Sequence, residues 1–134
     1  MAQLVPAETF DLVIFGGTGD LAMRKLLPAL YHRDLDGQLT PDSRIIAASR
    51  GELSREAYLG LVEDALRRNL AEGEFDEPFW LTFATRIHYV QADAFAHDEW
   101  SSLVQLLDSA EDRVRVAYLA TAPSLFGPIA QGLR

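Results

Sequence analysis

The chain has 134 residues, enough for one domain with a single hydrophobic core. It contains no cysteine, which excludes disulfides, thiolate metal sites and a cysteine nucleophile. Its formal net charge of -8 argues against nucleic acid as a partner, because phosphate backbones are bound by basic patches. No apolar run approaches the length of a membrane span and no signal peptide is recognisable, so a cytoplasmic protein without a membrane partner is expected.

The first part of the chain shows a strand, a helix and a second strand. Residues 10–16 form an apolar run that ends in glycines, which is typical of a parallel strand buried on both faces. A helix is predicted over residues 20–33 and ends before Gly37. Its apolar stripe consists of Leu27, Leu30 and Tyr31. Residues 44–49 predict the second strand.

A second long helix is predicted to begin at Ser54, a favourable N-cap. Its apolar positions share one helical face: Tyr58, Leu61, Val62, Ala65 and Leu66. Gly73 follows this helix. Residues 75–84 are ambiguous and predict a short helix after Pro78, and residues 86–91 predict the third strand.

The last part of the chain repeats the alternation. Asp98 is expected to cap a helix whose apolar face consists of Trp100, Leu103, Val104 and Leu107. Residues 113–120 predict the fourth strand. Pro123 breaks the chain, and Ser124 is expected to cap a final helix with Phe126, Ile129, Ala130 and Leu133 on one face. Strands and helices therefore alternate throughout, which predicts an α/β fold with a Rossmann-like, doubly wound parallel sheet.

The turn after the first strand reads Gly16-Gly17-Thr18-Gly19-Asp20-Leu21-Ala22. Such a turn bends sharply, approaches a pyrophosphate and begins a helix whose first N–H groups face the phosphates. Gly16 is expected to permit the bend, Gly19 to remove a Cβ where the ligand touches, and Ala22 to let the helix pack on the strand. Thr18 adds a hydroxyl donor. For Asp20, helix capping and a cofactor contact are equally expected, and the alternative for the whole motif is a simple connecting turn.

The end of the second strand indicates which dinucleotide is bound. NAD sites usually place an acidic residue there for the ribose 2′-hydroxyl, whereas this chain has Ser49-Arg50-Gly51. The guanidinium of Arg50 suits a 2′-phosphate or an adenine ring, so NADP is the predicted cofactor. The alternative is a surface arginine, or one that pairs with Glu52.

The end of the fourth strand, Tyr118-Leu119-Ala120-Thr121-Ala122-Pro123, lies beside the first strand in the predicted sheet. Ligands enter a doubly wound sheet at this switch point, and small residues there leave room for a dinucleotide. A plain strand-end turn is the alternative. The histidines share no motif, and no group of His, Asp or Glu residues has metal-ligand spacing. The sequence therefore predicts no catalytic residue and no metal site.

Several motifs resemble those of the glucose-6-phosphate dehydrogenases. The run from Gly16 to Leu26 (Gly-Gly-Thr-Gly-Asp-Leu-Ala-Met-Arg-Lys-Leu) and the following Leu-Pro-Ala-Leu-Tyr resemble the N-terminal fingerprint of that family. Arg50, the stretch Arg86-Ile87-His88-Tyr89 and the run from Tyr118 to Phe126 extend the resemblance over nearly the whole chain. It is closest to the bacterial members.

The resemblance implies an enzyme, homo-oligomeric at full length, that oxidises glucose 6-phosphate with NADP to 6-phosphogluconolactone and NADPH in the oxidative pentose phosphate pathway. It implies that one segment holds the pyrophosphate side of the cofactor: Gly16, Gly17, Thr18, Gly19, Asp20, Leu21, Ala22 and Met23. Arg50 would bind the 2′-phosphate. Thr121, Pro123 and Phe126 would lie near the nicotinamide. Gly51 departs from the family, which often has a polar side chain there, and this puts a second contact to the 2′-phosphate in doubt.

The family's catalytic histidine lies in an Arg-Ile-Asp-His-Tyr motif that this sequence does not contain. Residues 1–134 are therefore expected to be one dinucleotide-binding domain, truncated after the fourth strand and its helix, that lacks the catalytic and substrate domain. Alone, it is expected to bind cofactor without turnover. The alternatives are a stand-alone NAD(P)-binding module with a sensing or carrier role, and a remnant that folds poorly because its sheet is incomplete.

Overall fold

The structure, a computed structural model, describes residues 9–92, 100–109 and 113–120. Within these residues the chain forms one four-stranded sheet with the order β3-β2-β1-β4, and every neighbouring pair is parallel. The strands are β1 (Phe10–Phe15), β2 (Arg44–Ser49), β3 (Ile87–Gln91) and β4 (Val114–Leu119). The predicted doubly wound parallel sheet is confirmed, and each predicted strand lies within one residue of its observed bounds.

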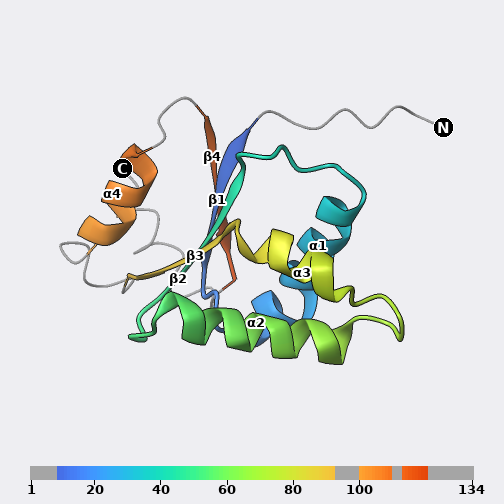
Figure 1. Cartoon of the computed structure of the whole chain (residues 1–134). Helices are drawn as coiled ribbons and strands as arrows, with labels where there is room; N and C mark the ends of the chain where they lie inside the picture. The colour runs from blue at the N-terminus through green and yellow to red at the C-terminus, as the bar shows by residue number, and fades with distance from the viewer. Residues whose placement is uncertain (1–8, 93–99, 110–112, 121–134) are drawn as a thin grey trace.

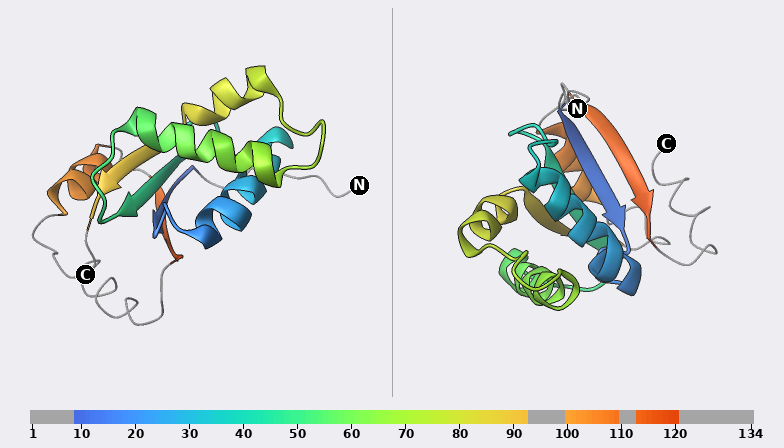
Figure 2. Two further views of the ribbon diagram at one scale, coloured as in Figure 1. Left: turned by 90° about the horizontal axis from the view of Figure 1, so that it is seen from below. Right: turned by 90° about the vertical axis from the view of Figure 1, so that its right-hand side faces the viewer.

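The helices lie on both faces of this sheet (Figures 1 and 2). They are η1 (Ala22–Leu26), α1 (Leu27–Leu35), α2 (Arg55–Asn69), α3 (Glu77–Ala84) and α4 (Ser101–Asp108). One face carries α1, α2 and α3, and α4 covers the other face. The predicted helix over residues 20–33 is continuous, but η1 is a π-helical turn in which the Leu27 amide donates to the carbonyl of Ala22. Such wide turns often occur near functional sites.

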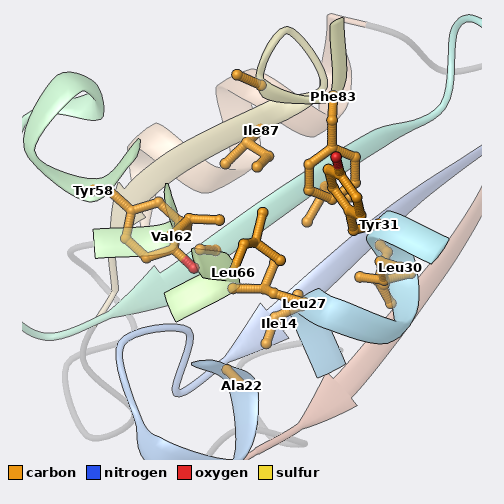
Figure 3. Close-up of a cluster of buried hydrophobic side chains, with 14 of the residues drawn as sticks. Ile14, Ala22, Leu27, Leu30, Tyr31, Tyr58, Val62, Leu66, Phe83 and Ile87 are labelled. Carbon is orange, nitrogen blue, oxygen red and sulfur yellow. The ribbon is translucent and has the colours of Figure 1, made fainter. Parts of the chain in front are cut away.

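The larger core lies between the sheet and α1, α2 and α3 (Figure 3). Its fully buried side chains include Ile14, Leu27, Tyr31, Tyr58, Val62, Leu66, Phe83 and Ile87. The predicted stripe of α1 is confirmed, and so is that of α2 except at Leu61, which is 43% exposed. Leu61 stands at the edge of the apolar arc of α2, and the buried arc is narrower than the spacing pattern allows.

The second core lies between the sheet and α4. It contains Val13, Phe15, Ile46, Trp100 and Leu103, and the rings of Phe15 and Trp100 lie 5.3 Å apart. The predicted apolar face of α4 is wrong at Val104, which is 50% exposed because it too lies at the edge of its arc. Asp98, the expected cap, and the final predicted helix from Ser124 lie outside the described residues.

Local sequence signals predicted most of the helix ends correctly. The side chain of Ser54 accepts a hydrogen bond from the amide three residues later and caps α2, as predicted. Asp76 caps α3 in the same way, so this helix begins before Pro78 rather than after it. Gly37 and Gly73, beyond α1 and α2, have φ values of 74° and 83°, conformations that favour glycine.

Buried ion pairs lie near the beginnings of the strands, away from the glycine turn, which follows the end of β1. The fully buried carboxylate of Asp11, near the start of β1, accepts from Arg44 Nε at 2.8 Å and Nη2 at 2.7 Å, and from Arg113 at 3.2 Å. Hydrogen bonding to Asp11 raises the pKa of Arg44. Arg86 forms a second buried pair, with Asp34, at 2.9 and 3.1 Å. Each of these buried carboxylates is thus paired with at least one guanidinium, which compensates its charge inside the scaffold.

Candidate dinucleotide-binding site

The candidate site lies where β1, β2 and β4 end. The amide of Gly16, just after β1, donates to the carbonyl of Ala48 in β2 at 2.9 Å. The amide of Ala120, just after β4, donates to the carbonyl of Phe15 at 2.9 Å. The sheet order reverses between β1 and β4, and ligands of doubly wound sheets bind at this switch point. The structure therefore brings the glycine turn, the Arg50 segment and the end of β4 to one edge.

The glycine turn is a tight backbone turn that leads directly into a helix. Gly16 has a φ of 83°, and the amide of Gly19 closes the turn by donating to the carbonyl of Gly16 at 2.9 Å. Helical backbone begins at Asp20, and the first amides of a helix have no acceptor within it. A Cβ on Gly19 would lie 3.2 Å from the carbonyl oxygen of Gly16, so a side chain there would require the turn to shift by a few tenths of an ångström. Ala22 is fully buried against the sheet, where it was expected to pack.

Gly17 and Tyr58 are linked in a way that the sequence did not predict. The buried hydroxyl of Tyr58 donates to the carbonyl of Gly17 at 2.8 Å. Burial, and secondarily the neighbouring Tyr89, raise the pKa of Tyr58 well above its ordinary value, so the hydroxyl remains a donor. A Cβ on Gly17 would lie only 2.6 Å from the Cβ of Ala47 in β2. The available signal was a tyrosine in an apolar helical face, whose hydroxyl needs a buried partner.

The outer side of the turn is polar and open to solvent. The carboxylate of Asp20 is 76% exposed and pairs with Arg24 one turn later at 3.1 Å. The cation of Arg24 therefore offsets the negative charge of Asp20 at the start of this helix. Thr18 and Asp20 line an open pocket together with Leu61 and Arg68, which accounts for the exposure of Leu61.

Arg50 follows β2 directly and its side chain is exposed. Among the described residues no ion pair or side-chain hydrogen bond engages its guanidinium, so the predicted alternative of a pair with Glu52 is not observed. The backbone around it is held from β3. Gln91 Nε2 donates to the carbonyl of Arg50 at 2.9 Å, and the hydroxyl of Tyr89 donates to the carbonyl of Gly51.

Comparison with known proteins identifies the family. The model of the family described as "Glucose-6-phosphate dehydrogenase, NAD binding domain" matches residues 13–134. The chain belongs to this family. The resemblance predicted from the glycine turn and the neighbouring motifs is therefore confirmed, and the fold is that of a coenzyme-binding domain.

Similar proteins carry the same name. The chain is 48% identical to a glucose-6-phosphate 1-dehydrogenase of Rhizobium meliloti (strain 1021) over 99% of its own length, and 47% identical to that of Gluconobacter oxydans (strain 621H) over 99%. It covers only 27% and 28% of these relatives. The crystal structure of the Mycobacterium avium enzyme matches 94% of the chain with a TM-score of 0.83 and 28% identity, and the chain covers 26% of it. A glucose-6-phosphate dehydrogenase in complex with glucose-6-phosphate matches 99% of the chain with a TM-score of 0.83 and 27% identity, and 28% of that protein is covered.

The structure describes only some of the remaining candidate residues and histidines. Thr121, Pro123 and Phe126 lie outside the described residues, as does His97. His32 is 3.7 Å from Glu74 at the surface. Burial, then the cations of Arg44 and Arg55, lower the pKa of His88, against the opposing effect of Asp11.

Two absences concern only the parts of the chain that the structure describes. They contain no group of His, Asp and Glu residues able to hold a metal ion. None of the helices found there is long and apolar enough to cross a membrane.

Proposed function

We propose that this chain binds NADP as the coenzyme-binding domain of a glucose-6-phosphate dehydrogenase. At full length, such a protein oxidises glucose 6-phosphate at C1 to 6-phosphogluconolactone, as the names of its relatives suggest. The choice of NADP rests on the guanidinium of Arg50, which is exposed and has no ion pair among the described residues. Arg50 follows β2, at the place where this fold binds the adenosine ribose.

The glycine turn fits the pyrophosphate of this coenzyme. Its backbone, from Gly16 to Met23, offers amides at the start of a helix, and Gly19 has no side chain to obstruct a close approach. When bound, NADP would supply the hydride acceptor for oxidation of the sugar. The chain contributes binding and orientation, with Arg50 at the 2′-phosphate and with Thr121, Pro123 and Phe126 near the nicotinamide.

No residue of this chain is assigned as the catalytic base. Hydride removal from a hydroxyl-bearing carbon needs a group that takes the hydroxyl proton, and the family's histidine motif does not occur in the sequence. We therefore expect the purified 134-residue chain, mixed with NADP and glucose 6-phosphate, to bind coenzyme but form no NADPH. Formation of NADPH above the level of a protein-free control would contradict this assignment.

Arg50→Ala tests the coenzyme assignment. Hydrogen bonds to charged groups contribute about 1.5–3 kcal/mol, so NADP affinity should fall by roughly 10- to 100-fold. NAD affinity should change little, because NAD has no 2′-phosphate. Isothermal titration of both coenzymes measures the ratio. Arg33→Ala is the matched control, since it removes another exposed cation, from the far end of α1. An equal loss for NADP and NAD in Arg50→Ala would refute NADP recognition by Arg50.

A further inference from the structure

The segment that carries Arg50 is held by side chains of β3. The hydroxyl of Tyr89 lies between Ser49 and Gly51: it is hydrogen-bonded to Ser49 Oγ and donates to the Gly51 carbonyl. Gln91 Nε2 donates to the carbonyl of Arg50 itself at 2.9 Å. Three consecutive residues, the last of β2 and the two that follow it, are therefore tied to the neighbouring strand by two side chains.

These bonds occur where the sheet no longer supports the backbone. The β2–β3 ladder ends at the pair of Ser49 and Gln91, followed by one bond from the Ala92 amide to the carbonyl of Ser49 at 2.8 Å. Arg50 and Gly51 lie beyond it and are exposed. A carbonyl outside a ladder bonds to water unless a side chain replaces the lost strand partner. Tyr89 supplies that replacement for the carbonyl of Gly51, and Gln91 supplies it for the carbonyl of Arg50.

Tyr89 is also packed against the residue that holds the glycine turn. The rings of Tyr58 and Tyr89 lie 5.1 Å apart with an interplanar angle of 31°, and the hydroxyl of Tyr58 donates to the Gly17 carbonyl. The two hydroxyls therefore act on different parts of the candidate site. That of Tyr58 supports the pyrophosphate turn, which NAD and NADP share, and that of Tyr89 supports the Arg50 segment.

We propose that Tyr89 is a positioning residue for NADP selectivity: its hydroxyl fixes residues 49–51 so that the Arg50 guanidinium is oriented toward a 2′-phosphate. This inference rests on the proposed function, in which Arg50 binds that phosphate. Because Tyr89 acts through Arg50, its hydroxyl should affect only ligands that carry the 2′-phosphate. A purely structural role would alter binding of all adenine ligands together.

Tyr89→Phe removes the hydroxyl and retains the ring that packs against Tyr58. The probes are 2′,5′-ADP and 5′-AMP, which differ only in the 2′-phosphate, titrated calorimetrically into the 134-residue chain. Affinity for 2′,5′-ADP should fall about two- to tenfold, the usual range for one net hydrogen bond, with 5′-AMP unchanged. Tyr58→Phe is the matched control, and it should leave the ratio of the two affinities unchanged. Gln91→Ala, at an exposed position, should lower the ratio in the same direction as Tyr89→Phe.

Arg50→Ala separates this inference from the proposed function. If Arg50→Ala leaves the ratio of 2′,5′-ADP to 5′-AMP affinity unchanged, the NADP assignment itself fails. If Arg50→Ala lowers the ratio while Tyr89→Phe and Gln91→Ala leave it at the wild-type value, the positioning role is overturned. In the double variant Arg50→Ala/Tyr89→Phe, the ratio should equal that of Arg50→Ala alone. A further loss would show that Tyr89 acts on the ligand directly and would also overturn the proposal.

Discussion

Gly17→Ala is the most informative single change in the glycine turn, because the added side chain would collide with strand β2 of the protein itself. The added Cβ would lie 2.6 Å from the Cβ of Ala47, 3.2 Å from its Cα and 3.3 Å from the hydroxyl of Tyr58. Ala47 is fully buried in β2, between β1 and β3, so it has no flexible atoms that can move aside. The turn itself must therefore shift away from the sheet.

The expected cost has two parts. Overpacking of a well-packed core costs about 1–3 kcal/mol. A shift that breaks the bond from Tyr58 to the Gly17 carbonyl adds about 1 kcal/mol. We expect Gly17→Ala to lower the free energy of unfolding by roughly 2–4 kcal/mol. Urea unfolding followed by tryptophan fluorescence measures this, because Trp80 and Trp100 report from the two cores.

Two further variants test the steric explanation. Gly60→Ala makes the same chemical change in α2, where an added Cβ meets no atom within 4 Å, and should stabilise the chain by about 0.5–1 kcal/mol. Ala47→Gly removes the clashing atom, so its combination with Gly17→Ala should show a favourable coupling of about 1 kcal/mol or more. A Gly17→Ala protein as stable as the wild type, or a double variant with no coupling, would refute the reasoning.

Three other predictions follow from the site and the scaffold. Gly51→Gln should raise NADP affinity about fivefold without changing NAD affinity, because an added Cβ meets only ordinary contacts at 3.8 and 3.9 Å and the amide adds a donor beside the proposed 2′-phosphate site. Calorimetric titration that shows equal gains for NADP and NAD would contradict it. The folded chain holds His88 with a pKa below its ordinary 6.5, so the unfolded state protonates first and stability falls as pH drops through 6.5. His88→Gln should reduce the loss of unfolding free energy between about pH 7.5 and about pH 5.5, and an unchanged loss would exclude His88 as its source. Arg86→Ala leaves the carboxylate of Asp34 buried and unpaired, and should cost about 3–5 kcal/mol in urea unfolding while the ratio of NADP to NAD affinity stays constant.

The sequence alone determined the features that depend on near neighbours in the chain. Apolar runs placed the four strands, Ser54 and Gly37 marked a helix start and a helix end, and the turn from Gly16 to Ala22 indicated the family. These features could be predicted because capping, left-handed φ values and buried strands each leave a signature within a few residues.

Only the tertiary structure decided which side chains meet across the sheet. The spacing pattern placed Leu61 and Val104 on apolar faces, but the width of the buried arc depends on what packs opposite. The need for glycine at position 17 comes from Ala47, thirty residues later and on another strand. The contact of Tyr89 with Gly51 spans a similar distance along the chain. Such pairs depend on strand order and register, which hydrogen bonding between strands sets and which no local pattern records.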